Sequence, residues 1–111
     1  MFSVESQGAV DVVKPMAPLC HDNAGDLLET VNARLSKGQP KVVLDMSDVP
    51  LIDSAGLDSL LDVQESLHSR GGIMKLAGVP QLCQEILRIT GVNQQFESHH
   101  DVKNAVRSFV Q

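Results

Sequence analysis

Residues 50–61 read PLIDSAGLDSLL and place a serine directly after an aspartate, between two apolar segments. Three kinds of chemistry fit Ser54 at the start of a helix. Its hydroxyl could cap the helix by accepting a backbone N–H, attack a substrate as a nucleophile, or accept a phosphate. Asp53 and Asp58 matter for all three roles, because their carboxylates make the surroundings of Ser54 negative.

The helix-cap interpretation of Ser54 depends on its position. Serine is a preferred residue immediately before the first helical turn, and helical spacing of apolar residues begins just after Ser54. We therefore expect Ser54 to be the N-cap of a helix over residues 55–69.

A nucleophilic role for Ser54 has weak support. The nucleophile elbow is G-x-S-x-G, whereas the residue two positions before Ser54 is Ile52. A catalytic base would have to be His21, His68, His99 or His100, and nothing in their spacing selects one. The sequence therefore predicts no catalytic residue and favours a protein that is not an enzyme.

Phosphorylation of Ser54 is compatible with a helix start. Free backbone N–H groups and the positive end of the helix dipole favour a phosphate there. The modification adds about −1.5 to −2 charge beside Asp53 and Asp58. A partner that docks at this corner would then be repelled.

Other ligand sites are poorly indicated. The chain contains neither G-x-x-x-x-G-K-[ST] nor G-x-G-x-x-G, so no phosphate loop is predicted. Asp45, Asp48 and Asp53 could hold Mg²⁺ in principle, but turn and cap roles explain them at least as well. His99 and His100 would point to opposite sides of a strand, and a solvated loop is favoured there. We expect no metal and no cofactor.

Composition narrows the class of partner. The 111 residues are 42% hydrophobic and 21% charged, which suits a single domain over residues 1–111. The net charge is −5 and the Lys and Arg residues are scattered, so neither nucleic acid nor a membrane surface is an expected partner. Without a membrane span or a signal peptide, we expect a cytoplasmic protein with Cys20 and Cys83 as reduced thiols.

Hydrophobic periodicity predicts the elements that position Ser54. Alternation around a Gln7-Gly8 turn indicates a hairpin over residues 2–15, and apolar runs indicate buried strands at 41–46 and 73–77. A short strand is expected at 96–98. Strands that alternate with helices imply an α/β fold with a largely parallel sheet.

Helical spacing predicts four helices, each with an inward apolar stripe. The expected stripes are Leu27, Leu28, Val31 and Leu35; Leu57, Leu60, Leu61 and Leu67; Leu82, Ile86 and Ile89; and Val102, Ala105, Val106 and Phe109. Besides Ser54, the expected caps and ends are, in chain order, Asp22 or Asn23, Gly38, Pro80 in the first turn of the third helix, Gly91, and Asp101.

Residues 41–106 resemble a STAS domain of the anti-sigma-factor antagonist type. The resemblance runs through a strand ending in Asp, the element IDSAGL at a helix start, a Gly-Gly turn, a strand, a helix ending in TG, a strand with Phe and an amphipathic helix. With the hairpin and the first helix it covers nearly the whole chain. It implies the α/β STAS fold, with a mixed, mostly parallel sheet of about five strands and about four helices.

The resemblance implies a binding protein. In this family the serine after the aspartate is phosphorylated by a partner serine kinase that is itself the anti-sigma factor, and a PP2C-like phosphatase reverses the modification. That serine matches Ser54 here, and its phosphorylation would switch binding off. The implied partner-binding residues are Asp22, Asp53, Ser54, Ala55, Gly56, Leu57 and Asp58.

Two further points follow from the resemblance. Many members carry an acid before the first helix where this chain aligns Cys20, so partner recognition is expected to differ there. The family also includes domains fused to anion transporters, and we expect this chain to be free-standing. An alternative function is a scaffold or adaptor subunit of a larger regulatory complex, without a switch and with Ser54 only as a cap.

Overall fold

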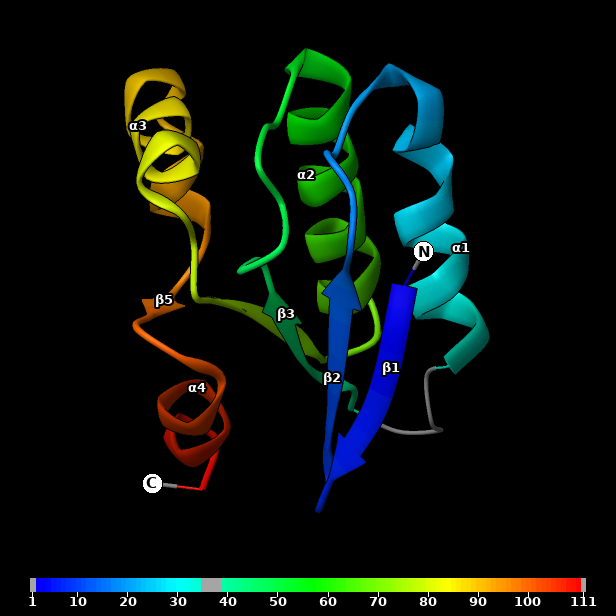
Figure 1. The fold of residues 1–111 in the computed structure, drawn as a ribbon. Coiled ribbons are helices and arrows are strands. Elements are labelled where there is room, and N and C mark those ends of the chain that lie inside the picture. Colours follow the sequence, from blue (N-terminus) through cyan, green and yellow to red (C-terminus); the bar gives the residue numbers. More distant parts are fainter. Residues whose placement is uncertain (1, 35–38, 111) are drawn as a thin grey trace.

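The computed structural model describes residues 2–34 and 39–110, and it has the predicted α/β architecture (Figure 1). The elements are, in chain order, β1 (Phe2–Gln7), β2 (Val10–Pro15), the 3₁₀ turn η1 (His21–Asn23), α1 (Ala24–Arg34), β3 (Lys41–Asp45), α2 (Ser54–His68), β4 (Ile73–Ala77), α3 (Gln81–Thr90), the 3₁₀ turn η2 (Val92–Gln95), β5 (Ser98–His99) and α4 (Val102–Ser108). Within the described ranges, no helix is long and apolar enough to cross a membrane.

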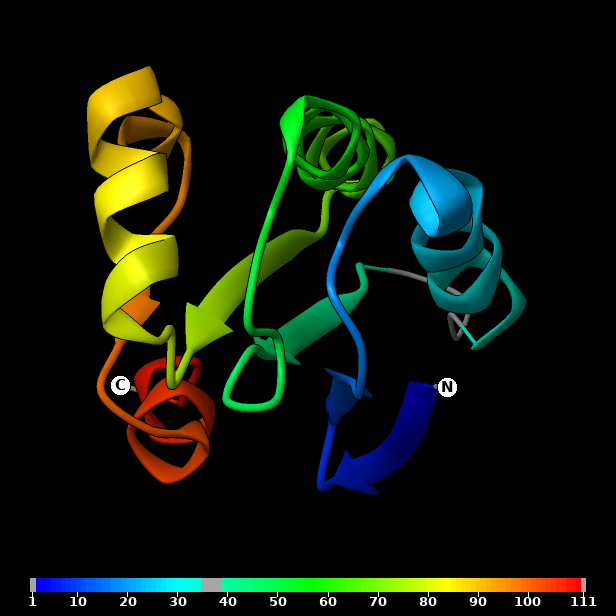
Figure 2. The ribbon, with the colours of Figure 1, turned by 45° about the horizontal axis from the view of Figure 1, so that its top comes forward.

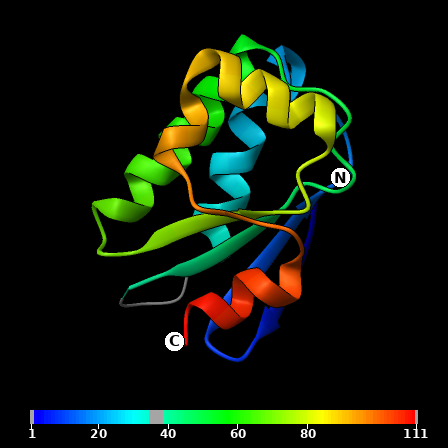
Figure 3. The same ribbon diagram turned by 90° about the vertical axis from the view of Figure 1, so that its left-hand side faces the viewer.

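The five strands lie side by side in chain order, β1-β2-β3-β4-β5 (Figure 2). β1 and β2 form the predicted antiparallel hairpin, which turns at Gly8 with a φ of 64°. The remaining neighbours are parallel. Because each right-handed crossover steps the same way across the sheet, α1, α2 and α3 all lie on one face. α4 follows the last strand and covers the opposite face (Figure 3).

This two-sided cover explains why β3 reads as a continuous apolar run. The adjacent residues Val42 and Val43 point to opposite faces, and both have no exposed surface. Val42 belongs to the large core under α1–α3, and Val43 to the small core under α4. The prediction of a buried strand here is confirmed, with its end at Asp45 instead of residue 46.

The apolar stripe predicted for α3 is wrong. Cys83 and Leu87 are buried, whereas Leu82 and Ile89 are 55% and 73% exposed. Ile86 is half-buried between the two sets. α3 lies over the narrow end of the sheet, where β5 has only two residues, so only a thin strip of the helix finds apolar surface to contact.

Several caps and bounds also differ from prediction. Cys20 is the N-cap of η1, and η1 leads directly into α1. The Asn23 side chain accepts the Cys20 N–H at 2.9 Å, so neither Asp22 nor Asn23 caps α1. Pro80 is the N-cap of α3 rather than a residue of its first turn. The short strand is Ser98–His99 instead of residues 96–98, because Phe96 still belongs to the end of η2, where it is buried in the large core.

Other predicted features are confirmed. Gly91 ends α3 with a φ of 78°, and Asp101 caps α4 by accepting the Asn104 N–H at 2.8 Å. The inward stripe of α4 packs in the small core as expected. Leu35 and Gly38, the expected end of the first helix, lie outside the described residues.

Gln64 compensates for the shortness of β5. β5 pairs only with Leu76 and Ala77, which leaves the first half of β4 with an open edge. The Gln64 side chain, 6% exposed, accepts the Met74 N–H at 2.9 Å and donates to the Met74 and Gln95 carbonyls at 3.2 and 3.1 Å. A buried glutamine thus supplies hydrogen bonds that a longer strand would have made.

Candidate functional site

Ser54 is the first residue of α2, and the prediction that it is the N-cap is wrong. The N-cap is Asp53, whose Oδ1 accepts the Gly56 N–H at 2.9 Å. Aspartate caps as well as serine does, and the carboxylate has a second oxygen that can bond elsewhere. Ser54 is exposed, and its hydroxyl is not used for capping.

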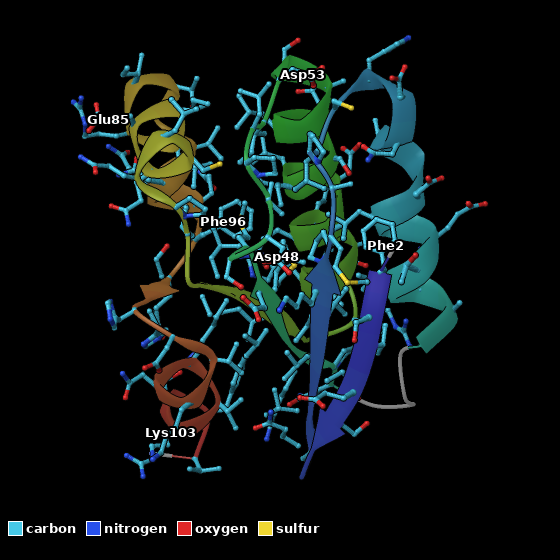
Figure 4. The ribbon with its side chains drawn as sticks, in the orientation of Figure 1. Phe2, Asp48, Asp53, Glu85, Phe96 and Lys103 are labelled. Carbon is cyan, nitrogen blue, oxygen red and sulfur yellow. The ribbon has the colours of Figure 1, made fainter. Side chains whose placement is uncertain are left out.

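The second oxygen of Asp53 joins two distant segments. Oδ2 accepts the N–H of His21 at 3.0 Å, across 32 positions of sequence. The Asp53 N–H donates to the Leu19 carbonyl at 3.1 Å, and the Leu19 N–H donates to the Leu51 carbonyl at 3.0 Å. We call this set of hydrogen bonds among Leu19, His21, Leu51, Asp53 and Gly56 the Asp53 clasp. It places the start of η1 beside the start of α2 (Figures 1 and 4).

The clasp favours the ionised form of Asp53. The Gly56 N–H, followed by the His21 N–H, lowers the pKa of this carboxyl below its ordinary value of 3.8, because both donors stabilise the carboxylate. Asp53 is therefore a fixed negative charge next to Ser54 at neutral pH.

Gly56 allows the first turn of α2 to lie directly against the loop before η1. A Cβ at this position would stand 2.2 Å from the Leu19 carbonyl oxygen. The space beside Gly56 is thus filled by the chain's own backbone, and Gly56 is buried.

The residues predicted to bind a partner differ in their accessibility. Ser54, Asp58 and Asp22 are exposed, and the clasp brings Asp22 of η1 to the same corner as Ser54. The half-buried ones are Asp53, Ala55 and Leu57. Further exposed acids lie along α1 and α2, namely Asp26, Glu29, Asp62 and Glu65; exposure of Asp62 and Glu65 agrees with the outward helix face expected from the sequence.

The three aspartates that could have held Mg²⁺ are not brought together. Asp45 accepts the Ser47 N–H at 3.1 Å, Asp48 pairs with Lys14 at 3.3 Å, and Asp53 belongs to the clasp. Figure 4 shows Asp48 and Asp53 well apart. The described part of the chain contains no group of three His, Cys, Asp or Glu residues that could hold a metal ion.

The remaining candidate residues have structural environments. His99 lies in β5 and pairs with Glu97, so the prediction that it belongs to a solvated loop is wrong. Cys20 and Cys83 are free thiols. Cys83 donates to the Val49 carbonyl at 3.3 Å, and burial raises its pKa.

A cavity of about 580 Å³ lies between α3 and the ends of β4 and β5. It was not foreseen from the sequence. Arg88 at its wall pairs with Glu85 at 2.6 Å, and His99 pairs with Glu97, so two of its charged or titratable groups already have partners.

The fold and site together define a small α/β domain with one clasped Asp-Ser corner at a helix start. The family model described as STAS domain matches residues 1–107, and the chain belongs to this family. This confirms the resemblance seen in the sequence.

Relatives of known structure or name agree on the fold. A Thermotoga maritima protein provisionally named an anti-sigma factor antagonist is 28% identical over 107 residues, which are 96% of this chain and 95% of that protein. A crystal structure from T. maritima with the same provisional description has a TM-score of 0.90 at 23% identity, covering 99% of this chain and 95% of that one. SpoIIAA from Bacillus in its phosphorylated form has a TM-score of 0.68 at 12% identity, covering 97% and 99%.

The contact between Gly56 and Leu19 leads to a prediction with a matched control. Gly56→Ala should lower the free energy of unfolding by about 1–3 kcal/mol, because overpacking against backbone outweighs the higher helix propensity of alanine. Gly25 in α1 has nothing within 4 Å of an added Cβ, so Gly25→Ala should raise it by about 0.5–1 kcal/mol. Urea unfolding of the two variants measures both effects; equal effects would argue against the close approach.

The lowered pKa of Asp53 predicts a pH dependence of stability. The hydrogen bonds to the carboxylate contribute fully above pH 3.8, and this contribution is lost as the pH falls through the lower folded-state pKa. The stability advantage of the wild type over Asp53→Asn should therefore shrink below pH 3.8 in denaturant titrations. Asp58→Asn removes an exposed acid outside the clasp and serves as the control. An Asp53→Asn difference that is constant with pH would contradict the assignment.

Proposed function

We propose that this chain is an anti-sigma-factor antagonist that binds a serine kinase acting as the anti-sigma factor, and that phosphorylation of Ser54 switches this binding off. The observation that carries the proposal is that the Ser54 side chain is exposed and takes no part in capping α2. Its side chain is exposed at the first position of a 15-residue helix, and the capping role belongs to its neighbour. Relatives named as antagonists, and a phosphorylated structure of SpoIIAA with this fold, support it.

A phosphate on Ser54 would not require the corner to unfold. The hydroxyl can be reached from solvent, and the positive end of the α2 dipole favours an anion at this place. The acceptors of the clasp are the Asp53 carboxylate and the Leu19 and Leu51 carbonyls. None of its hydrogen bonds therefore depends on the Ser54 hydroxyl.

The effect on the partner would be electrostatic. Phosphorylation places about −1.5 to −2 additional charge next to Asp53. To be phosphorylated, Ser54 must face the phosphates of the nucleotide bound in the kinase, so the product phosphoserine meets like charge in that site. Burying an unpaired dianion in the same interface is also unfavourable.

The proposal gives this chain a binding role with no catalytic residue of its own. A PP2C-like phosphatase would restore the binding-competent form. A cytoplasmic location, where ATP is available to the kinase, is part of the proposal. The alternative of a scaffold without a switch assigned Ser54 a capping role, and Asp53 fills that role.

The test uses the purified chain, ATP and the serine kinases encoded by the source genome. Ser54→Ala should abolish addition of one phosphate in intact-mass measurements and keep kinase binding, with a change in stability below about 0.5 kcal/mol because no cap is lost. Ser54→Asp should weaken kinase binding at least tenfold.

Ser98→Asp provides the control, since Ser98 is exposed and lies in β5. It should bind the kinase as the wild type does. A phosphate mapped to another residue, or full binding by Ser54→Asp, would disprove the switch.

A further inference from the structure

Two exposed apolar side chains lie in the segments that the Asp53 clasp joins. Met16 is 49% exposed and Leu51 is 47% exposed. Among the described residues, the other large apolar side chains that are exposed lie on α3 and beyond α4. Single exposed apolar residues are ordinary, but these two belong to neighbouring segments of one corner.

The segments that carry Met16 and Leu51 run parallel to each other. Leu19 and Ile52 form an isolated parallel bridge, and both of their side chains are buried. Because successive side chains of an extended segment alternate in direction, Pro18 and Leu51 lie next to each other on the outer side. Pro18 is exposed, and Met16 precedes it by two residues. We call Met16, Pro18 and Leu51 the Leu51 patch.

The Leu51 patch adjoins Ser54. The backbone of Asp53 is extended, with a φ of −97° and a ψ of −175°, so Asp53 lies on the same outer side as Leu51 and leads directly into Ser54. Leu51 and Ser54 are three residues apart, which separates their Cα atoms by at most about 11 Å. Figure 4 shows Asp53 and Lys103 of α4 at opposite ends of the molecule, so the patch lies far from α4.

A kinase that binds at Ser54 covers this patch. A stable protein–protein contact takes about 800 Å² from each partner, which corresponds to a round area of about 16 Å radius. An area of that size centred on Ser54 includes Leu51. The occupant of the patch therefore follows from the proposed modification of Ser54.

The charges around the patch indicate what kind of kinase surface fits it. Asp22 and Asp58 are exposed at the same corner, and Lys14, next to the patch in sequence, already pairs with Asp48 at 3.3 Å. The apolar side chains thus lie beside negative charge. A second copy of this chain, which has a net charge of −5, would bring acids against acids.

We infer that the Leu51 patch is the docking contact of the Ser54 kinase, and that it enters an apolar pocket of the kinase bordered by Lys or Arg. The inference rests on the proposed function and names the chemistry by which the kinase recognises its site. Leu51 takes no part in phosphoryl transfer. The patch therefore supplies affinity, and Ser54 supplies the switch.

The test measures phosphorylation of the whole chain by the kinase over a range of chain concentrations. Leu51→Ser should raise the KM for the chain at least tenfold and leave kcat within twofold, because a docking contact acts on binding rather than on phosphoryl transfer. Met16→Ser should raise the KM at least threefold. Leu51→Met should keep the wild-type KM, since methionine fills an apolar pocket of similar volume.

Val110→Ser is the matched control, since Val110 is 80% exposed and lies beyond α4. It should have the wild-type KM. An unchanged KM for Leu51→Ser, a lower kcat at unchanged KM, or an equal effect of Val110→Ser would overturn the inference. A dimer in sedimentation that Leu51→Ser breaks would assign the patch to a second copy and overturn it as well.

The two proposals fail in distinguishable ways. Phosphorylation of Ser54 with the same KM for the wild type and Leu51→Ser would retain the switch and remove the docking patch. If no kinase phosphorylates Ser54, the proposed function fails and the inference fails with it.

Discussion

The carboxylate of Asp53 is the constraint on which the candidate site depends. It caps α2 with one oxygen and holds the His21 N–H with the other, so two segments 32 positions apart become one corner. Gly56 makes the arrangement sterically possible, because its missing side chain leaves room for the Leu19 carbonyl. Through these contacts Ser54 is fixed in place while its own side chain stays unengaged.

This division of roles between neighbouring residues suits a reversible modification. Asp53 carries the structural role and Ser54 carries none, so a change at Ser54 alters charge without removing a hydrogen bond of the clasp. The proposed function thus places partner recognition at the start of α2, which the clasp holds in position.

The sequence predicts the architecture well because its strong patterns are local. Apolar runs, helical spacing and turn glycines specify the hairpin, the central strands, the end of α3 at Gly91 and the start of α4 at Asp101. The family resemblance supplies a mixed, mostly parallel sheet of about five strands, whereas the strand order comes from the structure. The N-cap of α2 could not be chosen this way, since Asp53 and Ser54 are both good caps. The His21 N–H favours Asp53, and that donor becomes a neighbour only through the fold.

The other misjudged residues have similar causes. α3 has two sets of apolar residues at helical spacing, and only the set of Cys83 and Leu87 contacts the core, which helical spacing alone does not reveal. Gln64 looks like a surface residue in the sequence, yet it replaces strand hydrogen bonds at an edge whose length no local pattern reveals.

The central claim is that Ser54 can be modified while the Asp53 clasp stays closed. Amide hydrogen exchange at His21 and Gly56, compared between the unmodified and the Ser54-phosphorylated chain, tests it most directly. The account predicts equal protection of both amides in the two forms. Loss of protection at either amide on phosphorylation would show that the modification opens the corner, and would contradict the account.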